Sequence, residues 1–172
     1  MHYDFGALTD IFRDLPEDAA EKAASAVNAH PRIFVYGAGR SGLMLKAFAM
    51  RLSQMGRVVY VVGETITPAL EENDLLILAS ASGNTASVCR CAAIAKEVGA
   101  ELFLLTASMQ SALTAIAPPD VCFRTPTKDD GSHTGSIMGT LFEQAVLLFL
   151  DMVVLHLDVD RASMRRRHAN LE

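Results

Sequence analysis

Apolar positions recur along the chain with two spacings, and the succession of these spacings predicts the order of its elements. From residue 4 to residue 29 apolar side chains recur every three or four positions, interrupted at Pro16, which predicts an amphipathic helical arm in two pieces. Unbroken apolar runs follow, and helical patterns over residues 43–55 and 84–98 stand between them. Such runs, separated by helices, are typical of a parallel sheet covered on both faces. We therefore expect a three-layer αβα sandwich with a five-stranded parallel sheet, whose strands cover residues 32–36, 57–62, 74–79, 101–105 and 121–124.

The last third of the chain has a different pattern. A polar loop at residues 126–135 precedes a nearly all-round apolar helix from about residue 137 to residue 157. A helix that is apolar on every side has to be buried on every side, and a domain of this size offers little room for that. We therefore expect a homo-oligomer, with a dimer as the minimum and a tetramer as the expected assembly. The predicted division is an N-terminal helical arm at residues 1–30 and one domain at residues 31–172.

Composition and charge narrow the classes of function. The net charge is -5 and the basic residues are dispersed, which argues against a nucleic-acid partner. We interpret the short basic run at residues 165–167 as the solvated end of a helix. Cys89, Cys91 and Cys122 lack the spacing of a metal site and indicate reduced thiols in a cytoplasmic protein. The N-terminus lacks the pattern of a signal peptide and no uncharged apolar run has membrane-spanning length, so we expect no membrane partner.

The segment after the third predicted strand carries three hydroxyl side chains around one glycine, just before a helical pattern begins. A helix N-terminus leaves backbone N–H groups unpaired and carries partial positive charge, so it can hold an anion. Hydroxyl groups add donors, and a glycine lets the backbone approach a ligand closely. The alternative is that Ser82 or Asn84 only caps the helix. The sequence favours a phosphate-binding loop formed by Ser80, Ser82, Gly83, Asn84 and Thr85.

A second glycine-rich turn follows the first predicted strand. Gly37, Gly39 and Gly42 fit the spacing of a dinucleotide fingerprint, and Glu64 has the place of the ribose-binding acid. The length of a single domain and the second hydroxyl-rich loop argue against that interpretation. Ser41 lies inside the glycine turn, so hydroxyl groups from two loops converge on one small phosphorylated ligand. In parallel sheets of this kind, ligands bind beyond the carboxyl ends of the strands.

These two loops together resemble the sugar isomerase (SIS) domain, a phosphosugar-binding fold of the flavodoxin and Rossmann kind. The resemblance rests on Gly37-x-Gly-x-Ser41 and Ser80-x-Ser-Gly-x-Thr85. Further segments are similar to the 6-phospho-3-hexuloisomerase family, at residues 48–52, 62–68, 138–143 and 167–171. That resemblance implies interconversion of D-arabino-hex-3-ulose 6-phosphate and fructose 6-phosphate, the second step of formaldehyde fixation by the ribulose monophosphate route. It covers nearly the whole chain from about residue 31.

Moving a carbonyl group between neighbouring carbons needs one group that takes and returns a proton through an enediol, and it demands neither a metal nor a redox cofactor. Glu143 is the candidate base, because apolar neighbours near the start of the last long helix predict a desolvated carboxylate. Without the resemblance, Glu143 would be interpreted as a helix-dipole residue only. Arg40 is predicted to pair either with the phosphate or with Glu64.

Two further site residues depend on weaker signals. His168 lies four residues before the end of the chain, where a histidine is ordinarily exposed, but the resemblance of the tail makes it a candidate acid that acts in a neighbouring subunit. Thr67 follows the second strand and could bind a sugar hydroxyl, or cap a short helix opened by Pro68. His133, in the polar loop, ranks lower.

Two other functions use the same loops. A sensor module would bind a phosphosugar without catalysis and would have no need for Glu143. A different isomerase of the same domain family would act on an aldose phosphate, but the segments at residues 63–68 and 138–140 favour the hexuloisomerase.

Overall fold

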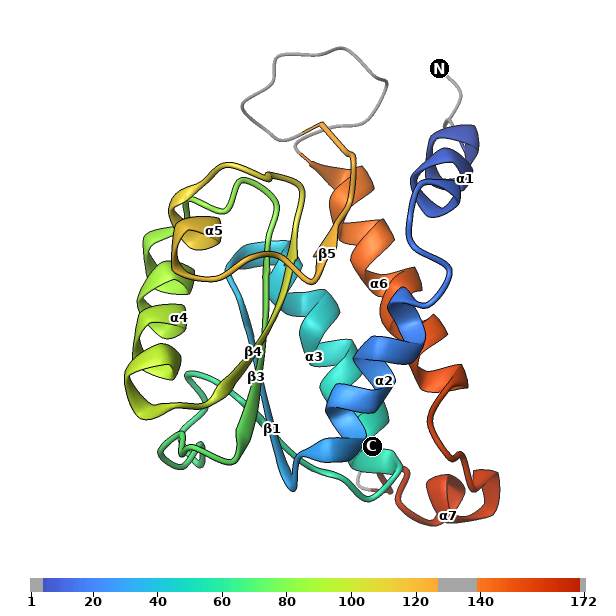
Figure 1. Cartoon of the computed structure of the whole chain (residues 1–172). Coiled ribbons are helices and arrows are strands. Elements are labelled where there is room, and N and C mark those ends of the chain that lie inside the picture. The colour runs from blue at the N-terminus through green and yellow to red at the C-terminus, as the bar shows by residue number, and fades with distance from the viewer. Residues whose placement is uncertain (1–4, 127–138, 171–172) are drawn as a thin grey trace.

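The structure is a computed structural model and describes residues 5–126 and 139–170. Its centre is a five-stranded sheet in which every neighbouring pair is parallel, with the order β2-β1-β3-β4-β5. The predicted five-stranded parallel sheet is therefore confirmed (Figure 1). The strands are β1 (Arg32–Gly37), β2 (Val58–Val61), β3 (Asp74–Ser80), β4 (Glu101–Thr106) and β5 (Val121–Cys122).

The strand order places a topological switch at the centre of the sheet. The chain leaves β1 toward β2 on one side, whereas β3 continues toward β4 on the other side. Consequently the loops that follow β1 and β3 diverge, and they leave a crevice at the carboxyl ends of these two adjacent strands. Both loops singled out in the sequence begin there.

Helices cover both faces of the sheet, which confirms the three-layer sandwich (Figure 1). Alternate strand residues point to opposite faces, so Ile33 and Val35 face one apolar layer while Phe34 faces the other. The first layer contains α2 (Ala19–Ala29), α3 (Gly39–Gln54) and α6 (Thr140–Leu155), with α1 (Phe5–Arg13) packed against α6. The second layer contains α4 (Ala86–Val98) and α5 (Ala112–Ile116), and α7 (Arg161–Arg166) contacts α3.

The predicted elements agree with the structure apart from a few short ones. The arm forms two helices, as predicted, and the apolar helix is α6, although residues 137 and 138 of its predicted start lie outside the described part. The alternative in which Thr67 caps a short helix after Pro68 is wrong, because residues 67–71 have no regular structure. The sequence did not predict α5, and of α7 it predicted only the basic end, where Arg165 and Arg166 lie in the last turn. No helix in the described part is long and apolar enough to cross a membrane.

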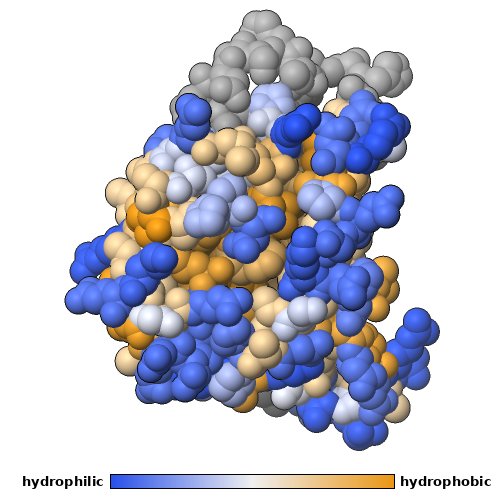
Figure 2. Space-filling view, in the orientation of Figure 1, coloured by the Kyte–Doolittle hydropathy of each residue, from blue (hydrophilic) through white to orange (hydrophobic). Residues whose placement is uncertain are grey.

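Helix α6 is buried along one side only. Phe142 and Phe149 make edge-to-face contacts with Phe123, at centroid distances of 5.8 and 5.7 Å, and both α6 rings are fully buried. On the other side, Leu148, Met152 and Leu155 are exposed by 43%, 42% and 81%. Over the face seen in Figure 2, hydrophilic side chains are spread widely and apolar ones gather in smaller areas between them.

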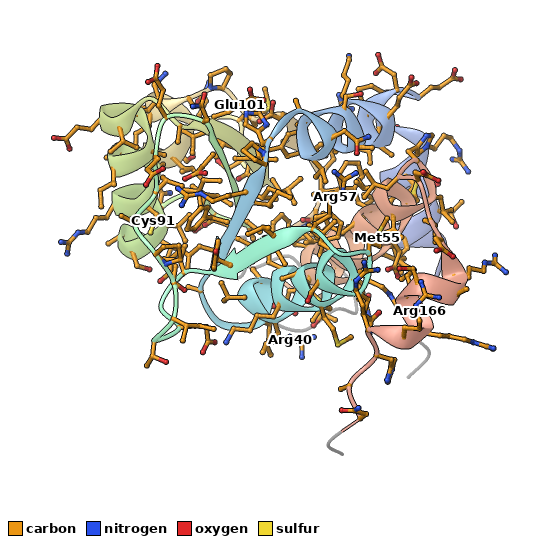
Figure 3. The ribbon with its side chains drawn as sticks, turned by 90° about the horizontal axis from the view of Figure 1, so that it is seen from below. Arg40, Met55, Arg57, Cys91, Glu101 and Arg166 are labelled. Carbon is orange, nitrogen blue, oxygen red and sulfur yellow. The ribbon has the colours of Figure 1, made fainter. Side chains whose placement is uncertain are left out.

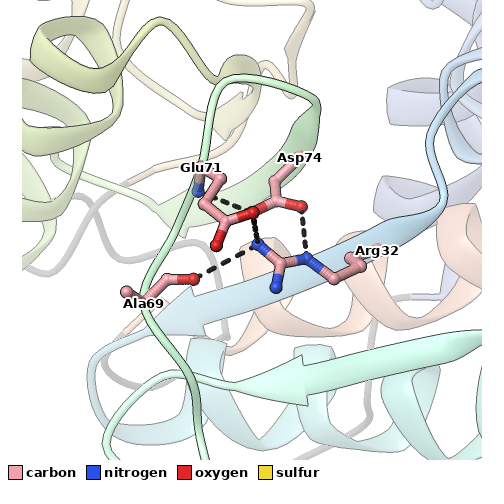
Figure 4. A network of polar contacts seen from close by, with 4 residues as sticks. All are labelled: Arg32, Ala69, Glu71 and Asp74. Carbon is pink, nitrogen blue, oxygen red and sulfur yellow. Dashed lines mark hydrogen bonds and ion pairs between the residues drawn. The ribbon is translucent and has the colours of Figure 1, made fainter.

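The amino ends of β1 and β3 are joined by an ion-pair network (Figure 4). Arg32 binds both carboxylate oxygens of Asp74, with Nε–Oδ1 and Nη2–Oδ2 distances of 2.7 and 2.6 Å. The backbone N–H of Glu71 donates to the same carboxylate at 2.6 Å, and Arg32 also contacts the Glu71 carboxylate at 3.1 Å. Asp74 is 1% exposed, so these bonds compensate its burial. The network fixes the chain at the end of the sheet opposite to the crevice.

Candidate functional site

A cavity of about 300 Å³ lies at the carboxyl ends of β1 and β3. Three segments that are far apart in the sequence line it: the start of α3, the loop from β3 to α4, and the start of α6. In Figure 1 all three helices begin on the upper side of the sheet. The cavity brings together six predicted site residues, namely Gly39, Ser41, Ser80, Ser82, Thr85 and Glu143.

The three helix starts make the cavity a favourable place for an anion. The N-cap residues are Ala38 for α3, Thr85 for α4 and Gly139 for α6, and none of them makes a side-chain cap hydrogen bond. No N-cap side chain binds the first-turn N–H groups of these three helices, and the three helix dipoles add positive potential. A phosphate group matches this set of donors.

The capping role considered for Ser82 and Asn84 is wrong. Ser82 Oγ accepts the Asn84 N–H at 3.3 Å within the loop, before α4 begins. Asn84 Oδ1 accepts the Ala112 N–H at 2.9 Å, so this side chain binds the first turn of α5. Asn84 thus joins the loop to the next segment of the chain, and it is not among the residues that line the cavity.

The rear of the loop is held by β4 and α5. Ser80 is 4% exposed; its Oγ accepts the Gly83 N–H at 3.2 Å, and its carbonyl accepts the buried Thr106 hydroxyl at 2.8 Å. Gly83 has φ +63°, and a Cβ built there would lie 2.1 Å from Ser111 Oγ. Glycine is therefore required for the close approach of the loop to α5. The reason given from the sequence was access for a ligand, which stays a prediction.

The first glycine turn is equally tight. A Cβ on Gly42 would lie 2.1 Å from the Gly37 carbonyl oxygen, so these two glycines allow β1 to pass directly into α3. Ser41 follows in the first turn of α3, and no described protein group forms a hydrogen bond with its hydroxyl. That hydroxyl is available to a ligand in the cavity. Glu64 belongs to a neighbouring cavity of about 270 Å³, where it pairs with Lys46 at 2.8 Å.

Glu143 occupies the first turn of α6 and is 8% exposed. Its carboxylate faces the cavity and accepts a hydrogen bond from Arg40 Nε. The partner predicted for Arg40 was a phosphate or Glu64, so the prediction of Glu64 is wrong. The sequence missed the Arg40–Glu143 pair, because 103 positions separate the two residues and nothing local links them. In Figure 3, Arg40 is labelled near α3.

Thr67 and His168 lie outside this cavity in the single chain. Thr67 donates its hydroxyl to the Val61 carbonyl at 2.6 Å and lines a small apolar pocket beside Pro68. His168 is exposed, and one ring nitrogen lies 3.1 Å from the Ala169 carbonyl. The predicted candidate His133 lies outside the described residues.

The tail that carries His168 lies at the far end of α3. A Cβ on Gly56, just after α3, would be 2.9 Å from the Arg167 guanidinium carbon. Figure 3 likewise shows Arg166 on the same side of the molecule as Met55 and Arg57. The cavity lies at the opposite end of α3, which has 16 residues and therefore a length of about 24 Å. His168 cannot reach the cavity of its own chain from this position.

Metal ligands do not gather within residues 5–126 and 139–170, where no three His, Cys, Asp or Glu side chains form a group that could hold an ion. The residues that line the cavity supply one carboxylate, one guanidinium, several hydroxyl groups and backbone N–H donors. This set suits a phosphorylated ligand with an acidic C–H group.

Known proteins share this fold and sequence. The family model described as SIS domain matches residues 27–153. A 3-hexulose-6-phosphate isomerase of Bacillus subtilis (strain 168) is 42% identical over 165 residues, which cover 91% of this chain and 88% of that protein. A 3-hexulose-6-phosphate isomerase of Mycobacterium gastri is 40% identical over 163 residues, which cover 91% of this chain and 81% of that protein.

A solved structure from Methanococcus jannaschii agrees with these relatives. A molecular function of 3-hexulose-6-phosphate isomerase was inferred for that protein from its crystal structure. It superposes on this chain with a TM-score of 0.79 at 32% identity, covering 96% of this chain and 93% of that chain. By its matched domain and by the extent of these relatives, this chain belongs to the SIS-domain family, in the group whose named members are 3-hexulose-6-phosphate isomerases.

Proposed function

We propose that this chain interconverts D-arabino-hex-3-ulose 6-phosphate and fructose 6-phosphate, the second step of the ribulose monophosphate route. The observation that carries the proposal is the position of Glu143, a buried carboxylate that faces the same cavity as the hydroxyl-rich loop and three helix starts. A phosphosugar whose phosphate binds at the helix starts has its reacting carbons in the remaining part of the cavity. Relatives named 3-hexulose-6-phosphate isomerase match most of the chain, which supports the proposal.

The reaction moves one proton between neighbouring carbons. Glu143, as carboxylate, takes the proton from C2 of the 3-ulose, and the electron pair of that C–H bond forms the C2=C3 bond of an enediolate. The carboxylic acid then returns the proton to C3, while the proton on O2 is lost and O3 is protonated, which leaves the carbonyl at C2. Ser41, Ser82 and Thr85 supply hydroxyl donors for the phosphate, and the first-turn N–H groups supply the rest.

A coupled assay tests this function. The purified protein, either untreated or treated with a chelator that is then removed, is given fructose 6-phosphate together with a 3-hexulose-6-phosphate synthase, and the release of formaldehyde is followed. We expect turnover that the chelator does not reduce. Absence of turnover by the wild type would reject the proposed reaction, and loss of turnover with the chelator would reject a mechanism without a metal.

The base has its own test. Glu143→Gln keeps the size of the side chain and removes its proton affinity, so the rate should fall at least ~100-fold, the usual effect of a positioned proton-transfer group. The affinity for fructose 6-phosphate, measured by calorimetry, should not fall, because Glu143 is not a phosphate ligand. A variant that keeps its rate would remove Glu143 from the catalytic role.

The assembly is proposed to be a homo-oligomer in which the tail of one subunit serves the site of another. The exposed apolar side chains of α6, including Leu155 at 81%, support an interface between copies. His168 lies too far from its own cavity to donate a proton there, so a neighbouring site is the place where it can act. We place the enzyme in the cytoplasm, where its three free cysteines are kept reduced.

Subunit mixing tests the shared site. Glu143→Gln and His168→Ala subunits, each expected to be inactive alone, are unfolded together, refolded and assayed. In a randomly mixed dimer about one site in four combines an intact Glu143 with an intact His168 of the other chain, so activity should return to that extent. If His168 acts within its own chain or has no role, mixing restores nothing beyond the sum of the two variants.

A further inference from the structure

We propose that Arg40 couples phosphate binding to the availability of the base: it holds Glu143 in the free enzyme, and a bound phosphate draws it away. The inference rests on the proposed function, because it requires Glu143 to take a proton from carbon. It goes beyond that function, because it assigns to one arginine the discrimination between phosphorylated and unphosphorylated sugars.

The first observation is the charge distribution in the cavity. Among the described lining residues, Arg40 is the single cation and Glu143 the single anion, and they are paired through Nε and Oε2. Glu143 makes no other ion pair or hydrogen bond through its carboxylate within the described residues. In the free site the carboxylate is thus occupied by a neighbouring guanidinium.

This pairing opposes proton uptake by the base. When either oxygen of Glu143 takes a proton from carbon, the carboxylate becomes neutral and the charge-assisted character of its bond to Arg40 is lost. Such bonds are about twice as strong as hydrogen bonds between neutral groups. While Arg40 stays in place, the reaction has to proceed against the loss of this interaction.

A phosphate in the same cavity competes for the guanidinium. Arg40 is the second residue of α3, one of the three helix starts without a side-chain cap, and its side chain is 61% exposed, so it is free to turn. A phosphate monoester carries up to two negative charges and three acceptor oxygens, and it matches the guanidinium in two-point hydrogen bonding. The dianion therefore outcompetes a single carboxylate, and Glu143 is released when the phosphate arrives.

The consequence for specificity is direct. Fructose without a phosphate enters a site in which the base is still paired, so its C3 proton is removed slowly. Fructose 6-phosphate enters with the group that releases the base. The rate of proton removal from bound fructose 6-phosphate should exceed the rate from bound fructose by about 10- to 100-fold. This factor corresponds to the free energy of one charge-assisted hydrogen bond.

Hydrogen exchange on unphosphorylated fructose tests the coupling. In deuterated water, Glu143 takes the C3 proton of fructose, the C–H electron pair forms the enediolate, and the exchanged carboxyl group returns a deuteron; proton NMR follows the loss of the C3 signal. We expect phosphite dianion to accelerate exchange by the wild type. Arg40→Ala should exchange about 10- to 100-fold faster than the wild type without phosphite, and it should respond little to phosphite.

Arg90→Ala is the matched control, because Arg90 is an exposed arginine on α4 that does not line the cavity. This variant should behave as the wild type in both conditions. If Arg40→Ala is no faster than the wild type without phosphite, or if it keeps the full response to phosphite, the coupling is refuted.

A second measurement does not depend on turnover. In protein labelled with ¹⁵N in its arginine side chains, the Arg40 Nε–H signal is the one that Arg40→Lys removes. Without phosphate the signal should differ between the wild type and Glu143→Gln, and saturating inorganic phosphate should bring both to one position, because Arg40 then binds phosphate in each protein. An unmoved signal at saturating phosphate would overturn the coupling. A moved signal in a wild type that fails to isomerise the phosphosugar would reject the proposed function and leave only the displacement of Arg40 from Glu143 by phosphate.

Discussion

Gly83→Ala should be among the most damaging single-methyl changes in the phosphate-binding loop. The added Cβ would lie 2.1 Å from Ser111 Oγ and 2.7 Å from Ser111 Cβ, and φ at this position is +63°. The left-handed backbone costs a residue other than glycine about 1–2 kcal/mol, and forcing a carbon into a packed contact costs about 1–3 kcal/mol. The free energy of unfolding should fall by about 2–5 kcal/mol.

The structure also indicates how this damage spreads to the site. Ser111 caps α5 by accepting the Thr114 N–H at 3.2 Å, so it cannot turn away without uncapping that helix. If α5 moves as a unit, two bonds that hold the loop are lengthened: Leu113 N–H to the Gly83 carbonyl and Ala112 N–H to Asn84 Oδ1, both 2.9 Å. The affinity for fructose 6-phosphate should therefore fall together with the stability.

Gly39→Ala is the control that isolates the cost of placing a residue other than glycine in the left-handed backbone conformation. Gly39 has φ +59°, close to that of Gly83, but a Cβ there would meet nothing within 4 Å. Urea unfolding followed by circular dichroism should therefore show a loss of only about 1–2 kcal/mol for Gly39→Ala. In the Gly83→Ala background, Ser111→Gly removes both clashing atoms and should recover part of the lost stability. Equal losses for Gly83→Ala and Gly39→Ala would refute the reasoning from the Ser111 contact.

Three other sites lead to further predictions. Ser82→Ala removes a hydroxyl that lines the cavity and should raise the Michaelis constant for fructose 6-phosphate without a comparable change in maximal rate; an unchanged constant would count against the phosphate loop. Arg32→Ala leaves Asp74 buried without its cation and should lower the free energy of unfolding measured in urea, whereas Asp74→Asn combined with Arg32→Ala should lose less. Burial raises the pKa of the Cys91 and Cys122 thiols, so both hold less thiolate at pH 8 than a free cysteine; mass spectrometry should show slower alkylation by iodoacetamide than for glutathione, and equal rates would contradict it.

The sequence predicted the sheet well because buried parallel strands leave a local signature. Residues 74–79 are apolar apart from Asp74, and β3 is buried along its whole length. The location of the site could be predicted from a second local rule, since the glycine and hydroxyl loops come after strands whose carboxyl ends share one edge. Six of the predicted site residues accordingly line one cavity.

The remaining features depend on contacts between distant segments. Arg40 lies in an exposed helix start, and only the packing of α3 against α6 decides that its partner is Glu143. Asn84 is a residue type that often caps helices, but its side chain binds α5. The sequence did not reveal α5, because the five residues of this helix give no periodic pattern. Thr67 was predicted from its place after β2, yet its hydroxyl satisfies a backbone carbonyl nearby.

The contact between Gly37 and Gly42 bears on how such sequences are classified. The missing Cβ atoms leave room for the chain to turn from a strand directly into a helix, and this room is needed whatever ligand binds. The spacing of glycines that is often taken as a sign of a nucleotide cofactor is here a property of the turn itself. Proteins that catalyse different reactions but have the same direct turn from a strand into a helix will share glycines at the positions of Gly37 and Gly42. A search for function in such folds should therefore compare the loop between β3 and α4, where the hydroxyl groups of Ser80, Ser82 and Thr85 distinguish this chain.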